Sequence, residues 1–175
     1  PQEGYSPSPQ ERQSWLQISY MKEAYHTMGP KFTLGWMAEA LYSSKNFSEN
    51  YTATMMQAGE FAPTPHSKLM YNEAFRANQY VAAGIKPIYV LNDMFQFRTE
   101  FYGFTPIFPI KKNALNKAYY GKAFSRFEYM GEVSVICHLP FGAISAYVNH
   151  YSSPKKEWNV GLTLGWQLFN YRFIE

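Results

Sequence analysis

The sequence lacks long hydrophobic runs, paired cysteines and a strong net charge. Although 46% of its 175 residues are hydrophobic, no run reaches the roughly 18 apolar residues that a membrane-spanning helix needs, so such a helix is excluded. The single cysteine, Cys137, rules out an internal disulfide. A formal net charge of +3 is too small to indicate nucleic acid as a partner.

Signatures of catalysis and of metal binding are also missing. The nucleophile elbow G-x-S-x-G does not occur. The four histidines (His26, His66, His138 and His150) lie on different segments without the spacing of a metal site. We therefore expect no catalytic residue, metal or cofactor in this chain. The opening residues P-Q-E-G-Y-S-P-S-P have neither a basic start nor an apolar core, so no signal peptide is expected within the sequence.

Aromatic residues are abundant instead. They make up 19% of the chain, with 15 Tyr, 14 Phe and 4 Trp. A soluble core uses far fewer. Belts of aromatic side chains at the two interfaces of a membrane are one physical reason for such an excess.

The clearest pattern is a long alternating segment over residues 157–171. From 157 to 168 its even positions are apolar and its odd positions are small or polar, and successive strand side chains point to opposite faces. This alternation, sustained over roughly ten residues, is the length that a tilted strand needs to cross a bilayer. The segment predicts a strand with one face toward lipid and the other toward a lumen; the apolar face is Val160, Leu162, Leu164, Trp166 and Leu168.

Six further segments alternate in the same way, over residues 14–27, 32–42, 78–89, 95–102, 127–139 and 144–149. Lys22 falls on the apolar parity of the first segment, where a bulge could absorb it. Arg98 and Glu100 share one parity and Phe97 lies on the other. This segment separates charged from apolar side chains more sharply than any other in the chain. Short turns near Gly29, Asn92 and Pro140 alternate with longer loops over 45–78, 106–122 and 152–156.

These features predict an all-β protein, an antiparallel transmembrane β-barrel of about seven strands. Residues 1–12 are expected to be a linker, and residues 13–175 to be the strands, with a long inward-folding loop at 45–78. Short periplasmic turns and longer outer loops are typical of outer-membrane barrels, which would place the C-terminus in the periplasm. Bacterial single-chain barrels have an even number of strands, so we expect a strand that the pattern does not reveal, or further strands outside this sequence.

The order of elements resembles the last seven strands of the sixteen-stranded BamA-type surface-antigen barrel. It is most similar to the C-terminal barrel of patatin-like phospholipases of the Bacteroidota outer membrane. The matching stretches cover about 120 residues and include none of the family's catalytic signatures: Y-T-A-T-M-M-Q-A-G-E-F-A-P-T-P-H-S-K, F-R-A-N-Q-Y-V-A-A-G-I-K-P-I-Y, F-R-T-E-F-Y-G-F-T-P-I, G-A-I-S-A-Y-V-N-H-Y-S-S-P-K and W-N-V-G-L-T-L-G-W-Q-L-F-N.

The resemblance implies a role for Phe75, Arg76 and Ala77. In the family, the long loop before the last five strands folds into the lumen and carries V-R-G-F/Y, whose Arg pairs with acids on the inner wall. Arg76 is the matching residue, Ala77 replaces the family's Gly, and Lys86 stands where the family has an acid. An Arg paired with a carboxylate in a partly dehydrated lumen would lock the loop. The acids expected as its partners are Glu100, Glu128 and Glu132.

The resemblance implies a segment that anchors, or also translocates, a patatin-like lipid hydrolase domain encoded upstream in a Gram-negative outer membrane. Its expected partners are outer-membrane lipids or lipopolysaccharide, the remaining barrel strands and an upstream periplasmic or surface domain. Three alternatives stay open: a small complete barrel serving as adhesin or narrow pore, a non-enzymatic surface-antigen assembly barrel, and a soluble lipocalin-type sheet. The lipocalin alternative requires the apolar parity to point inward around a cavity.

Overall fold

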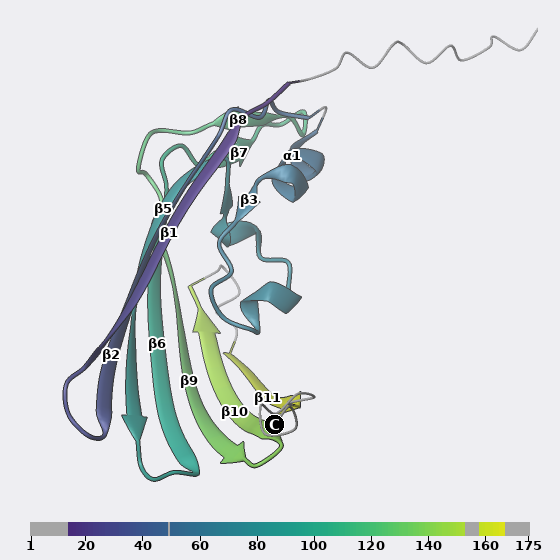
Figure 1. Cartoon of the computed structure of the whole chain (residues 1–175). Coiled ribbons are helices and arrows are strands. Elements are labelled where there is room, and N and C mark those ends of the chain that lie inside the picture. The colour runs from purple at the N-terminus through teal and green to yellow at the C-terminus, as the bar shows by residue number, and fades with distance from the viewer. Residues whose placement is uncertain (1–13, 49, 153–157, 167–175) are drawn as a thin grey trace, which may run out of the picture.

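The computed structural model describes residues 14–48, 50–152 and 158–166. One sheet contains seven long strands in the order β1-β2-β5-β6-β9-β10-β11, and every neighbouring pair is antiparallel. The chain is therefore all-β, and its described strands form an open, curved sheet (Figure 1). Each predicted alternating segment overlaps one of them, and β6 and β10 extend furthest beyond the prediction: β1 (Gln17–Thr27), β2 (Phe32–Ser43), β5 (Gln79–Val90), β6 (Phe95–Pro106), β9 (Glu128–Leu139), β10 (Gly142–Tyr151) and β11 (Trp158–Trp166).

The connections between strands differ in length at the two ends of the sheet. Residues 28–31, 91–94 and 140–141 make short turns at one end, and residues 44–78, 107–127 and 152–157 make the connections at the other. At the second turn the side chain of Asn92 accepts hydrogen bonds from the backbone of Met94 (3.0 Å) and Phe95 (2.8 Å), the local bonding that favours Asn in turns. The predicted alternation of short and long connections is confirmed.

The long connections contain short elements of their own. Residues 44–78 contain α1 (Tyr51–Gln57), β3 (Gly59–Glu60), η1 (Ser67–Leu69), η2 (Glu73–Phe75) and β4 (Arg76–Ala77). The Asn50 side chain caps α1 by accepting a hydrogen bond from the backbone N–H of Ala53. Residues 107–127 contain a hairpin that the alternation did not predict, formed by β7 (Ile110–Lys112) and β8 (Ala118–Tyr120).

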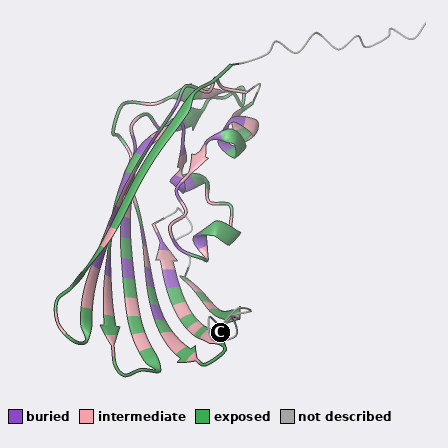
Figure 2. Cartoon of the chain, viewed as in Figure 1, coloured by how far each residue is buried: buried purple, intermediate pink, exposed green. Residues whose placement is uncertain are grey.

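The loop over residues 45–78 packs against one face of the sheet, which we call the inner face (Figure 1). Its Phe61, Ala74 and Phe75 join a core cluster with sheet residues such as Tyr80 and Phe104. The opposite, outer face has no covering element among the described residues. Burial therefore alternates along the strands, as the stripes in Figure 2 show for β6, β9 and β10.

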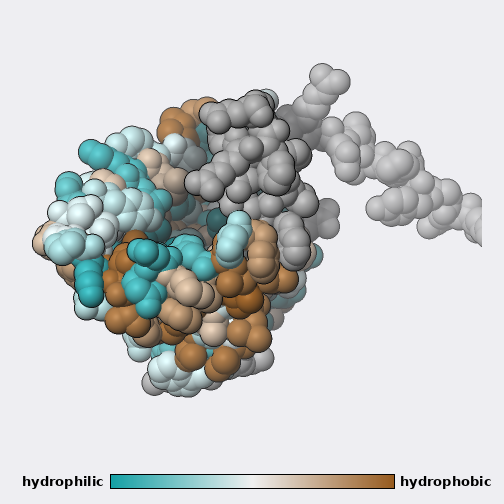
Figure 3. Space-filling view, turned by 60° about the horizontal axis from the view of Figure 1, so that its bottom comes forward, coloured by the Kyte–Doolittle hydropathy of each residue, from teal (hydrophilic) through white to brown (hydrophobic). Residues whose placement is uncertain are grey.

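The predicted parity of the two faces is confirmed by burial. Phe97 is 43% exposed and Leu164 is 65% exposed, whereas Glu100 is only 4% exposed beneath the loop. The apolar parity thus points outward, contrary to what the lipocalin alternative requires. Hydrophobic side chains also reach the surface at the short turns, among them Met28, Leu91 and Met94, and brown patches mark that end of the molecule in Figure 3.

One detail differs from the expectations. The pairing of β1 with β2 runs without a bulge through Lys22, which lies opposite Ala38 and places its ammonium 5.7 Å from the centre of the Trp36 ring. That cation–π contact accommodates the charge on the outer face. The C-terminal strand β11 is an edge strand of the sheet, and residues 167–171 of the predicted segment lie outside the described residues.

Aromatic side chains lie over glycines of neighbouring strands. Tyr102 lies directly opposite Gly84 and covers it so closely that a Cβ at that glycine would stand 2.1 Å from the Tyr102 ring. Tyr147 covers Gly161 in the same way, with its hydroxyl oxygen 2.3 Å from the place of a Cβ. These glycines allow large rings to lie flat along the curved inner face.

Candidate functional site: the folded loop and the inner face

The sequence Phe75-Arg76-Ala77 holds the loop on the sheet. Phe75 is 1% exposed, and its ring centre lies 5.6 Å from that of Phe104 and 6.0 Å from that of Tyr151. Ala77 is fully buried. The carbonyl of Phe75 accepts a hydrogen bond from the backbone of Phe61 (2.9 Å), which joins the two halves of the loop.

Arg76 lies between these halves and bonds within the loop. One terminal nitrogen, Nη1, donates to the carbonyls of Met55 (3.3 Å), Met56 (3.1 Å) and Ala58 (3.4 Å), at and just after the C-terminal end of α1. The other, Nη2, binds the carboxylate of Glu60. A guanidinium is suited to this position, because its planar set of donors satisfies helix-end carbonyls and a carboxylate together.

The expected partners of Arg76 are corrected by this geometry. The two-residue ladder β3–β4 sets Glu60 directly opposite Arg76, so the ion pair forms inside the loop and not with the wall acids Glu100, Glu128 or Glu132. The sequence could not reveal this ladder, because two residues are too few to show an alternation. Arg76 therefore closes the loop on itself, and the aromatic cluster attaches the closed loop to the sheet.

The three wall acids have other neighbours. Glu100 lies with its Oε1 2.8 Å from Nε of Arg98 and accepts a hydrogen bond from the hydroxyl of Tyr102. Glu128 pairs with Arg126 at 2.7 Å, near the long-loop end of the sheet. Glu132 is 4% exposed and lies directly opposite Glu100.

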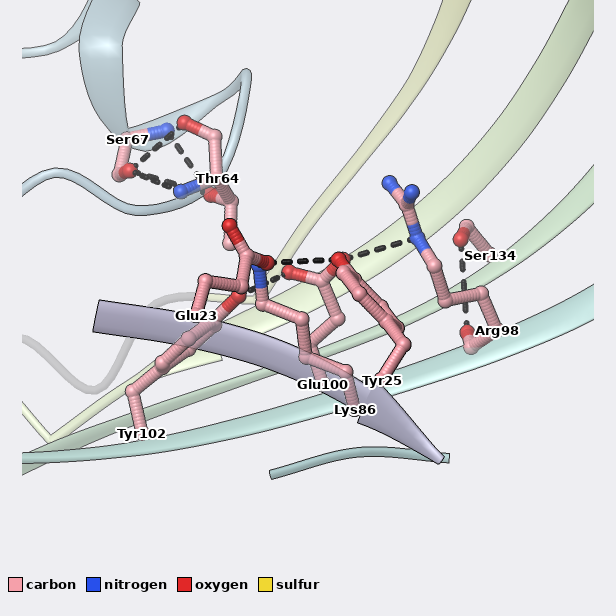
Figure 4. Close-up of polar contacts among 9 residues, drawn as sticks. All are labelled: Glu23, Tyr25, Thr64, Ser67, Lys86, Arg98, Glu100, Tyr102 and Ser134. Atoms are coloured by element: carbon pink, nitrogen blue, oxygen red, sulfur yellow. Dashed lines mark hydrogen bonds and ion pairs between the residues drawn. The ribbon is translucent and has the colours of Figure 1, made fainter. Parts of the chain in front are cut away.

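A second ion pair joins the edge of the sheet to its centre. Lys86, 8% exposed, binds the carboxylate of Glu23 on β1, and Glu23 also accepts from the hydroxyl of Tyr25 at 2.6 Å. Figure 4 shows these side chains beside Arg98 and Glu100 on the inner face. Lys86 therefore has its own acidic partner, Glu23, on the inner face. The sequence analysis did not identify Glu23 as an inner-face acid, although Glu23 lies on the polar parity of the first alternating segment.

A row of polar side chains crosses four neighbouring strands at the level of Glu100. Pairing sets Glu100 opposite Glu132, Glu132 opposite Asn149, and Asn149 opposite Asn159. Asn149 is 2% exposed, and several buried atoms of the row have no hydrogen-bond partner: Glu132 Oε2, Asn149 Oδ1 and Nδ2, and Asn159 Nδ2. The row therefore places one carboxylate and two amide side chains next to Glu100 across neighbouring strands of the inner face.

The middle of the loop is tied to β10 near this row. Nδ1 of His66 lies 2.9 Å from the hydroxyl of Tyr151, and the ring also lies near that of Tyr147. Partial burial lowers the pKa of His66, so the neutral form is favoured in the folded loop. Thr64 and Ser67 bond to each other and fix the turn that carries His66; the Ser67 hydroxyl donates to the Thr64 carbonyl at 2.8 Å (Figure 4).

The inner face offers structural and electrostatic chemistry. No group of three or more His, Cys, Asp or Glu side chains within 14–48, 50–152 and 158–166 is placed to hold a metal ion. Among the described residues, no helix combines the length and the apolar character needed to cross a membrane.

Comparisons with family models, curated proteins and solved structures find no match to this chain.

Proposed function

We propose that this chain is part of the wall of a surface-antigen-type outer-membrane β-barrel, and that this barrel anchors a patatin-like lipid hydrolase domain encoded upstream. The proposal combines two lines of support. The barrel is supported by the chemistry of the two faces, by the loops and by the edges of the sheet. The hydrolase is supported by the resemblance of the sequence stretches to the barrel of those phospholipases.

The distribution of charge is the observation that carries the barrel. The outer face of the seven strands has a single charged residue, Lys22, and no acid. Side chains such as Phe101, Val133 and Leu162 are 49, 53 and 79% exposed on that face. A sheet with water on its inner face and hydrocarbon on its outer face would favour this separation of charged from apolar side chains. The inner face carries the other seven charged residues of the strands: Glu23, Glu39, Lys86, Arg98, Glu100, Glu128 and Glu132.

The free edges of the sheet support a larger barrel. Backbone groups of β1 and β11 that point away from the sheet have no partner among the described residues. In hydrocarbon each unpaired group costs several kcal/mol. The first and seventh strands of an antiparallel sheet run in the same direction, so antiparallel closure requires an odd number of further strands. Two copies in the same membrane orientation would place β11 of one copy parallel to β1 of the other, whereas an odd number of further strands from the same protein would keep every pair antiparallel.

The lengths of the loops support one orientation of the sheet in the membrane. The short turns at Gly29, Asn92 and Pro140 correspond to periplasmic turns, and the long connections to outer loops. In this orientation the chain's C-terminal strand ends in the periplasm of a Gram-negative cell. The partners are then outer-membrane lipids or lipopolysaccharide, the remaining strands and the upstream domain. The loop over residues 45–78 blocks part of the lumen from the outer side.

Extraction from membranes tests the barrel. The full chain is expressed with its natural export signal, and membranes are washed with urea before the protein is solubilised in detergent. A barrel remains in the membrane after urea and migrates faster in a gel before boiling than after. Release into the urea wash, or solubility without detergent, would refute the proposal. A patatin-type G-x-S-x-G in the residues encoded upstream would support the hydrolase part, and its absence there would remove it.

A further inference from the structure

Two apolar grooves lie side by side on the outer face, near the long-loop end of the sheet. One has a volume of about 240 Å³, with Ala83 and Gly103 at its floor and Phe127 at its rim. The other has a volume of about 300 Å³ and lies over Gly131, between Tyr129 and Trp158. Both depressions exist because residues without large side chains stand among exposed aromatic ones.

An aromatic ridge separates the grooves. Pairing sets Gly103 opposite Tyr129 and Phe101 opposite Gly131, and the rings of Phe101 and Tyr129 are stacked 6.0 Å apart between the two glycines. The second groove is bounded further by the rings of His150 and Trp158, whose centres are 4.7 Å apart. The outer face therefore has two adjacent grooves with the aromatic ridge between them.

The connection whose two ends adjoin the first groove, next to Thr105 and at Phe127, is basic and contains no acid. It spans residues 107–127 and joins β6 to β9, the strands that carry the two floor glycines. Its lysines 111, 112, 117 and 122 are exposed, and none has a carboxylate partner in the described part of the chain. The side chain of Lys111 lies over Gly121, which brings it beside Lys122. Exposed Tyr119 and Phe124 lie on the same connection.

We propose that the grooves and this basic connection form one binding site for a phosphorylated, anionic lipid. Lys111 and Lys122 would contact the phosphate, and acyl chains would lie in the grooves on either side of the ridge. Charge complementarity identifies the headgroup, since lysines without acids attract phosphates at a membrane surface. The apolar grooves indicate that the rest of the ligand is hydrocarbon. The inference rests on the proposed function, because it requires the outer face to meet lipid.

Quenching of Trp158 fluorescence by brominated lipid tests this site. The full chain and its Trp158→Phe variant are reconstituted in phosphatidylcholine bilayers that contain phosphatidylglycerol, with bromine on the acyl chains of only one lipid at a time. The difference between the two proteins isolates the Trp158 signal. We expect brominated phosphatidylglycerol to quench Trp158 more strongly than brominated phosphatidylcholine at equal mole fraction.

Charge and shape are then varied separately. Lys111→Gln and Lys122→Gln should each lower the preference for phosphatidylglycerol about fivefold, whereas Lys31→Gln, at the opposite end of the sheet, should leave it unchanged. Gly131→Leu fills a groove, since a Cβ there meets nothing closer than 3.6 Å, and should reduce quenching by phosphatidylglycerol. A thermal unfolding scan of each variant separates loss of the site from loss of the fold.

Several outcomes would overturn the inference. Equal quenching by the two lipids would do so, and so would lysine variants that behave like the Lys31 control. If sodium phosphate abolished the preference where sodium chloride of equal ionic strength did not, the connection would bind free phosphate and not a lipid. If neither brominated lipid quenched Trp158, the outer face would not meet lipid, and the proposed function itself would fail.

Discussion

Glu132 lies directly opposite Glu100 in the ladder between β6 and β9, and both side chains are 4% exposed. Glu100 has Arg98 and the Tyr102 hydroxyl as partners, whereas Oε2 of Glu132 has none. Like charges directly opposite one another destabilise a sheet. The two acids therefore have unequal roles: Glu100 belongs to a bonded group, and Glu132 adds negative charge beside it.

Replacing each acid by its amide should separate these roles. Glu132→Gln removes the repulsion and should stabilise the folded protein by about 0.5 kcal/mol. Glu100→Gln weakens the contacts of Arg98 and Tyr102 and should destabilise it by about 2 kcal/mol. Denaturant unfolding of the detergent-solubilised protein measures both free energies. The opposite order would show that Glu132 has a stabilising partner.

Removing the guanidinium of Arg76 should release the loop from its closed form. Arg76→Met keeps much of the apolar stem but leaves the Glu60 carboxylate and three carbonyls near the end of α1 without their donor. The expected loss of stability is about 3 kcal/mol. Hydrogen exchange over residues 51–77 should become faster.

The matched control for that change is Arg126→Met. Arg126 also pairs with a carboxylate, that of Glu128 next to the start of β9, but the Arg126 side chain is 29% exposed, whereas that of Arg76 is 12% exposed. Its removal should cost less than about 1 kcal/mol and leave exchange in residues 51–77 unchanged. Equal effects of the two substitutions would contradict the assignment of Arg76 as the residue that closes the loop.

Acidification should loosen the contact between the loop and β10. The pKa of His66 is lowered by burial, so the unfolded loop binds a proton more readily than the folded one. The stability of the docked loop is therefore complete above about pH 6.5 and declines as the pH falls below that value. Protection factors of the amides of residues 61–70 at pH 7.5 and pH 5.5, in which the pH dependence of intrinsic exchange is divided out, measure the change, and Tyr151→Phe should remove part of the docking already at the higher pH. Protection factors that are equal at the two pH values would exclude His66 as the sensitive group.

Two glycines on opposite faces of the sheet should respond differently to a methyl group. At Gly84 a Cβ would meet the Tyr102 ring at 2.1 Å and the Phe101 carbonyl at 2.9 Å. Gly84→Ala should therefore destabilise the protein by about 2 kcal/mol. At Gly131 the nearest atom is 3.6 Å away, so Gly131→Ala should change stability little. Thermal unfolding of the two variants compares them directly, and equal midpoints would contradict the packing of Tyr102 over the inner face.

The parts of the fold that the sequence predicted are those with a local period. Alternation with a period of two located all seven long strands and assigned Phe97 and Glu100 to opposite faces, because side-chain direction depends only on position along a strand.

The candidate site was less predictable, because its contacts join residues far apart in the chain. The residues of the loop motif were recognised, but the pairing of Arg76 with Glu60 depends on a ladder of two residues. The contact of Lys86 with Glu23 depends on β1 lying two strands away in the sheet. The hairpin of β7 and β8 has only three residues in each strand, too few to stand out from a basic loop.

The account depends on the outer face meeting hydrocarbon while the inner face meets water. Spin labels at Val133, Ser134 and Val135 of the membrane-reconstituted full chain, with Cys137 replaced by Ser, test this most directly, because three neighbouring positions must alternate. We predict frequent collisions of the labels at Val133 and Val135 with lipid-soluble oxygen, and infrequent ones at Ser134, which is 3% exposed on the inner face. Equal access of a water-soluble nickel chelate to all three positions, or the reverse alternation, would contradict the account.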